Sequence, residues 1–130
     1  MLMKILFCFF CLSLILGASC SSQRSSRAVT PEAGLKKIHF DLNEIDENGL
    51  TGPPDGQRSV AYEFCIPFDS AMRKEVLRID KSIRFFNGPS GRVGCGTDQY
   101  LCIGEGGNRK ALLELAGLPY VKVIMPFYGE

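Results

Sequence analysis

Three cysteines could carry chemistry in the region expected to fold: Cys65, Cys95 and Cys102. Cys95 lies between two glycines and is sterically open, so it is a candidate nucleophile with His39, the only histidine, as its base. The same thiols are candidates for a structural disulfide, either Cys65 with Cys102 or Cys95 with Cys102, and an odd number leaves one thiol over. The sequence has no Cys-x-x-Cys motif after residue 20, which favours a structural bridge over redox catalysis.

A glycine-rich junction between an expected strand and an expected helix is the second candidate site. It reads Gly104-Glu105-Gly106-Gly107-Asn108-Arg109-Lys110. Backbone amides at a helix start bind anions, and two cations there are unfavourable unless an anion accompanies them. We therefore expect any small-anion site to comprise Gly106, Gly107, Asn108, Arg109 and Lys110. The plainer alternative is that Asn108 only caps the helix and both cations point to solvent.

The other glycine-rich stretch, residues 88–98, lies at the opposite end of the expected strand 99–103. The two stretches are therefore expected to be separate candidate sites, and they could form one pocket only if the longer loop folds back over the open face of the sheet.

Metal chemistry has weaker support. His39 and the three cysteines provide zinc-binding atoms but lack the close ligand spacing typical of zinc sites. Residues 44–55 resemble a calcium-binding loop, but begin with glutamate and contain Pro53 and Pro54 where a helix should start. We predict no metal site and no cofactor.

The first 19 residues have the features of a signal peptide. A short cationic start precedes an apolar run, residues 5–16, and small residues follow. Leu16-Gly17-Ala18-Ser19-Cys20 resembles the lipobox of bacterial lipoproteins, although Gly17 replaces the usual large aliphatic residue. The resemblance implies lipidation of Cys20 and anchoring to the bacterial cell envelope. Simple secretion is the alternative. Residues 20–34 are expected to be a polar tether.

Length and charge limit the possible functions. A chain of 130 residues is expected to contain one folded domain, here residues 35–130. The 15 basic residues less Lys4 leave 14 after residue 19, against 14 acidic residues. This balance disfavours binding to nucleic acid.

Hydrophobic periodicity predicts an α+β domain. Alternation predicts strands over residues 36–42, 59–67, 82–86, 99–103 and 120–127, and helical spacing predicts helices over 70–79 and 109–116. Asp69 and Asn108 are the expected N-caps, and residues 43–58 are expected to form a loop.

Leaving aside the first strand, the order of elements is βαββαβ. It predicts a ferredoxin-like split-βαβ sandwich with a four-stranded antiparallel sheet and an additional N-terminal strand. Right-handed crossovers are expected to place strands 60–66 and 99–103 side by side at the centre and parallel, with both helices on one face. With Leu101 and Ile103 facing the helices, Cys65 and Cys102 are expected to share the open face.

These features favour a non-enzymatic, exported binding or assembly module whose partner is an envelope protein or a small anionic ligand. The alternatives are a cysteine-dependent enzyme using Cys95 with His39, and a small-anion-binding protein that uses the junction.

Overall fold

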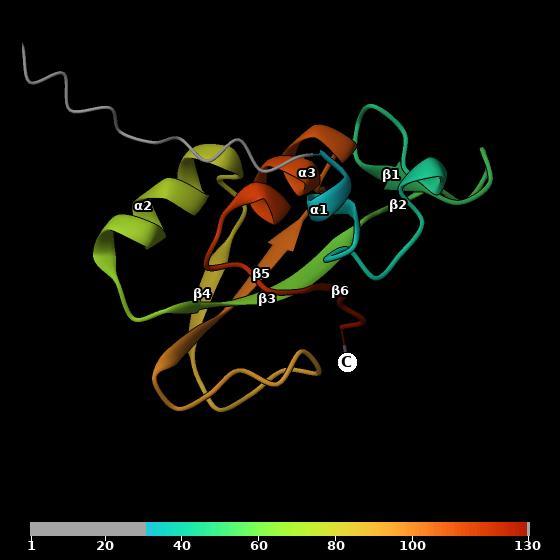
Figure 1. Ribbon diagram of the computed structural model, residues 1–130. Helices are drawn as coiled ribbons and strands as arrows, with labels where there is room; N and C mark the ends of the chain where they lie inside the picture. Colours follow the sequence, from blue (N-terminus) through green and yellow to red (C-terminus); the bar gives the residue numbers. More distant parts are fainter. Residues whose placement is uncertain (1–30, 130) are drawn as a thin grey trace, which may run out of the picture.

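The computed structural model describes residues 31–129 and confirms an α+β fold (Figure 1). The predicted signal peptide, residues 20–30 and Cys20 lie outside the described residues. The elements, in chain order, are α1 (Pro31–Leu35), a 3₁₀ helix η1 (Leu42–Glu44), β1 (Leu50–Thr51), β2 (Arg58–Ser59), β3 (Ala61–Pro67), α2 (Ser70–Ile79), β4 (Arg84–Asn87), β5 (Gln99–Glu105), α3 (Arg109–Gly117) and β6 (Ile124–Pro126).

The main sheet has the strand order β4-β5-β3-β6, and every neighbouring pair is antiparallel. The central strands β3 and β5 pair over seven positions, from Ala61 opposite Glu105 to Pro67 opposite Gln99. Their predicted adjacency is confirmed, but the common direction was wrong. The chain reverses between β4 and β5, so β5 runs against both β4 and β3. The finer assignment to a ferredoxin-like fold stays a prediction.

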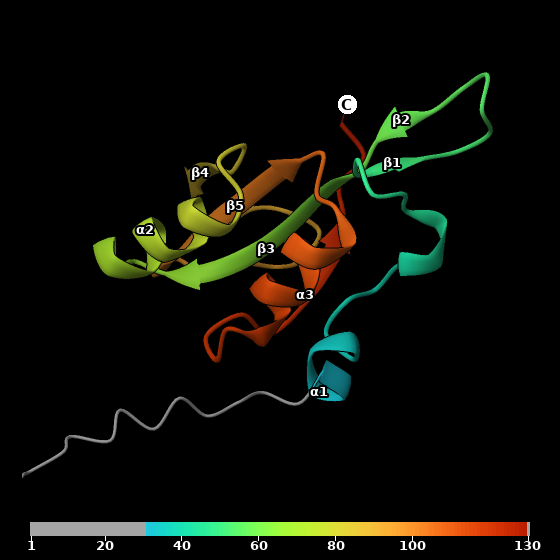
Figure 2. The ribbon, with the colours of Figure 1, turned by 90° about the horizontal axis from the view of Figure 1, so that it is seen from above.

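The helices α2 and α3 cover one face of this sheet, with α1 packed beside α3, and the loop of residues 88–98 crosses the other face (Figures 1 and 2). The alternation in β3 explains the larger core. Tyr62, Phe64 and Ile66 are fully buried on the helix side, where Val76 of α2 and Leu112 of α3 belong to the same cluster. Alternate residues of a strand face opposite sides of a sheet, so Glu63 and Cys65 face the loop.

Both main helices begin at the predicted caps. The Asp69 side chain accepts a hydrogen bond from the amide of Met72, and Asn108 accepts one from Ala111. Each bond satisfies an amide that the first helical turn leaves without a partner. None of the helices within residues 31–129 is long and apolar enough to cross a membrane.

The N-terminal part of the domain differs from the prediction. Instead of a strand over residues 36–42, Ile38 makes one isolated parallel bridge to Ile124, and Leu42 begins η1. Both side chains are buried, so the apolar alternation in residues 38–42 arises from contact with the core and not from pairing in a strand. Most of the short antiparallel pair β1–β2 falls in the expected loop over residues 43–58, and β2 ends one residue beyond it, at Ser59.

The helix α1 occupies residues 31–34 of the range predicted to be a tether and ends at Leu35. Its Gly34 is buried, and a Cβ built on that residue would be 3.6 Å from the Cβ of Ala116. Small residues on both helices therefore allow α1 and α3 to approach closely.

Candidate functional site

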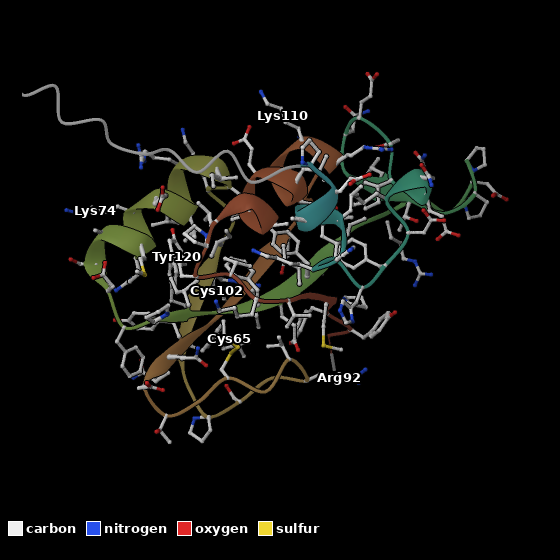
Figure 3. The ribbon with its side chains drawn as sticks, viewed as in Figure 1. Cys65, Lys74, Arg92, Cys102, Lys110 and Tyr120 are labelled. Carbon is white, nitrogen blue, oxygen red and sulfur yellow. A yellow bond between two sulfur atoms is a disulfide. The ribbon has the colours of Figure 1, made fainter. Side chains whose placement is uncertain are left out.

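The cysteine pair that forms the disulfide is Cys65 with Cys95, so both predicted pairings were wrong (Figure 3). Cys65 does face the open side of the sheet, as expected. Cys102 instead faces the helices and is fully buried, as a free thiol. The bridge joins β3 to the 88–98 loop.

The predicted cysteine pairing was wrong because Leu101 and Ile103 of β5 were expected to face the helices. Leu101 and Ile103 face the loop and are only 5% and 7% exposed, while Cys102 between them is 0% exposed on the other face. A strand buried on both faces shows no polar alternation, so the sequence pattern does not tell which side of β5 faces the helices.

The free thiol of Cys102 is poorly suited to catalysis. Burial raises the pKa of Cys102 to about 12, an effect that nearby Arg73 only partly offsets. Because the thiolate is the reactive form, this thiol is expected to be inert at neutral pH.

The proposed nucleophile–base pair, Cys95 with His39, is not supported. The Cys95 sulfur is bonded to Cys65, and the residue is only 4% exposed. His39 is exposed, and its backbone amide donates to the carbonyl of Ile124 at the sheet edge. The disulfide also removes two thiols from the candidate zinc set. Across residues 31–129 there is no cluster of three or more His, Cys, Asp or Glu side chains arranged to hold a metal ion.

The longer glycine loop folds back over the open face of the sheet. Its Val93 amide donates a 2.7 Å hydrogen bond to Oε1 of Glu63, which is only 1% exposed. Val93 and Cys95 pack with Leu101 and Ile103 in a second, smaller apolar cluster. Sequence analysis missed Glu63 as a site residue. The available signal was a carboxylate in the middle of an otherwise apolar strand.

Packing requires two of the three glycines in the 104–110 junction. A side chain on Gly104 or Gly107 would overlap the ring of Tyr62. The amides of Gly106 and Gly107 donate to the Val60 carbonyl at 2.8 and 3.4 Å. These two amides therefore already have partners within the protein.

The polar side chains of the junction have weaker partners. Arg109 Nη1 donates to Asn43 Oδ1 at 3.3 Å, and Lys110 Nζ lies 4.0 Å from Glu114 Oε1. Both cations are exposed, and Lys110 extends away from the sheet (Figure 3).

A groove of about 670 Å³ lies beside this junction, between α1 and α3. Residues from both helices, the N-cap of α3 and the segment between η1 and β1 line it: Pro31, Gly34, Glu47, Asn108, Arg109, Lys110, Leu113, Glu114 and Gly117. Of the five candidate anion-binding residues, the groove brings together Asn108, Arg109 and Lys110, and leaves out Gly106 and Gly107. Its volume lies in the range of small-molecule sites.

Comparison with protein-family models, with curated proteins and with solved structures finds no match for this chain.

Proposed function

We propose that this protein is a non-enzymatic, exported module that binds a small amphiphilic anion in the groove between α1 and α3. The observation that supports the proposal is the position of two weakly partnered cations, Arg109 and Lys110, beside a groove of ligand size.

The groove combines two chemistries. Leu113, Pro31 and the small residues Gly34 and Gly117 offer apolar surface, while the start of α3 adds the positive end of a helix dipole to the two cations. Glu47 and Glu114 also line the groove, so its formal charge is balanced. Arg109, Lys110 and the positive end of the helix dipole all lie at the end of the groove where α3 begins. A ligand with an apolar body and one carboxylate at that end fits this arrangement.

The proposed compartment is the cell envelope of a bacterium. The Cys65–Cys95 disulfide supports an oxidising compartment, where such bonds persist. The proposal includes lipidation of Cys20, with residues 21–30 as a polar spacer between the membrane and the domain. Mass spectrometry of the mature N-terminus tests it. An unmodified N-terminus at another residue refutes the lipid anchor and leaves the binding proposal intact.

Calorimetric titration with sodium octanoate tests the binding proposal, with acetate and octan-1-ol as the matched ligands. Octanoate should bind saturably and raise the melting temperature, since a ligand that binds only the folded state stabilises it. Acetate lacks the apolar body and octanol lacks the charge, so both should bind at least about tenfold more weakly, as expected for the loss of roughly 1.4 kcal/mol.

The double variant Arg109→Ala/Lys110→Ala should lose this preference for octanoate over octanol. Lys74→Ala is the control, because Lys74 is an exposed lysine on α2, away from the groove (Figure 3). Absence of saturable octanoate binding, or equal binding by the double variant, would overturn the proposal.

A further inference from the structure

The 88–98 loop covers the open face of the sheet but is attached to it at few points. Within the described residues, one hydrogen bond joins this loop to the face of β3, from Val93 to Glu63, and one covalent bond joins Cys95 to Cys65. Most other hydrogen bonds of the loop stay within it or close its base, including Gly94 to Gly91 and Gly88 to Gln99. At the end of the loop, the Phe68 amide donates to the Asp98 carbonyl at 3.2 Å. The loop contains no helix or strand of its own.

The surface under the loop is unlike the rest of the exterior. Leu101 and Ile103 are nearly fully buried there, Phe127 packs at the edge of the same cluster, and the Glu63 carboxylate lies among them at 1% exposure. Removing the loop would expose an apolar surface that contains one carboxylate. The loop also reaches the C-terminal segment, because the Arg92 guanidinium lies 5.5 Å from the centre of the Tyr128 ring.

We infer that the 88–98 loop is a redox-released cover: reduction of Cys65–Cys95 frees the loop and exposes the surface around Glu63, while the rest of the domain stays folded. The inference does not depend on the groove or on its ligand. It rests on the small number of attachments and on the separation of this apolar cluster from the larger core across the sheet.

The reductant is a dithiol. Its thiolate attacks the sulfur of Cys65, the more exposed of the two bridged residues, forms a mixed disulfide on β3 and releases the thiolate of Cys95 with the loop. The second thiol of the reductant then attacks the mixed disulfide. The products are two cysteine thiols and the oxidised, cyclic reductant, so two electrons pass to the protein.

Cys102 does not interfere with this exchange. It is the next residue along β5 from Leu101, which lies opposite Cys65, but its side chain faces the helices on the other side of the sheet. The free thiol is therefore out of reach of the bridge while the sheet is intact.

Hydrogen exchange of the intact protein, measured with and without dithiothreitol, tests the inference. Reduction should speed exchange in residues 88–98 by at least about tenfold, while β3, β5 and α3 keep their protection, as expected for a local opening. Trypsin cleavage after Arg92 should accelerate in parallel, because a protease needs a locally unfolded segment. Binding of a hydrophobic dye should increase.

Two variants serve as matched controls. Cys102→Ala retains the bridge, so its loop should stay protected until dithiothreitol is added. Cys65→Ser/Cys95→Ser should show fast loop exchange without reductant and no further response to it. Unchanged loop exchange in the reduced wild type overturns the inference. Simultaneous loss of protection throughout the domain also overturns it, because the disulfide would then stabilise the whole domain and not the loop alone. Both outcomes are measured on the wild type, so neither depends on the folding of a variant.

Discussion

The ring of Tyr62 fills the space that a side chain on Gly104 would need. The two residues are direct partners across the central strands, and Gly107 leaves room for the same ring from the following turn. The phenol hydroxyl then reaches the end of α2, where it donates to the carboxylate of Asp80. The glycines at this junction are thus required by a buried aromatic residue on the neighbouring strand.

Gly104→Ala should destabilise the domain by about 3 kcal/mol, because the new methyl group overlaps a ring that is fully buried and held at its far end. Urea unfolding measures the loss. Gly117→Ala is the control, since that position lies at the end of α3 with open space around its Cβ, and alanine there should be neutral or stabilising by up to about 1 kcal/mol. Equal effects would show that ring packing does not determine the cost.

Tyr62→Phe should lower the free energy of unfolding by about 1.5 kcal/mol, the lower end of the range for a hydrogen bond to a charged group. The cost stays moderate because the other oxygen of Asp80 still accepts from the Ser82 amide at 2.8 Å. Tyr128→Phe should change stability very little, since Tyr128 is 64% exposed. A Tyr62→Phe protein as stable as the wild type would contradict the role assigned to this bond.

Alkaline pH should destabilise the domain through Cys102. Burial raises the pKa of this thiol from 9.0 to about 12, so the unfolded chain releases the proton before the folded one does. The stabilising contribution is complete below pH 9 and is lost as the pH rises toward 12, which amounts to about 2 kcal/mol by pH 10.5. Cys102→Ala should show a shallower fall in stability over pH 8.5–10.5. Parallel pH profiles for the two proteins would refute the assignment.

Gly91→Ala should loosen the 88–98 loop more than Gly94→Ala. Both glycines have left-handed backbones, with φ of 81° and 76°, so each substitution costs about 1 kcal/mol on that account. Only at Gly91 would the new Cβ also meet the sheet, at 2.7 Å from Cδ1 of Leu101, whereas Gly94 has open space. Hydrogen exchange of the loop amides should therefore increase more in Gly91→Ala, and identical exchange in both variants would contradict the packing of Gly91 on Leu101.

The sequence predicted the elements whose signals are local. The helix caps Asp69 and Asn108 and the alternation in β3 depend on nearby residues, and the structure confirms them. The face of β5 was mispredicted because both of its sides are buried, one by helices and one by a loop that no periodicity describes. The burial of Glu63 was missed for the same reason: its partner Val93 comes from 30 residues later and has no recognisable motif.

The position of Cys102 also has a consequence for biogenesis. Among the three cysteines within residues 31–129, the shortest ring that can form before the sheet does joins Cys95 to Cys102, seven residues apart, whereas the native bridge spans 30 residues. Loop-closure statistics favour the shorter ring by about ninefold, so early oxidation selects the wrong pair. Pairing of β5 with β3 turns Cys102 toward the helices and leaves Cys65 as the partner of Cys95. The yield of correctly bonded protein should therefore depend on whether strand pairing precedes thiol oxidation, or on an isomerase that reverses the premature bond.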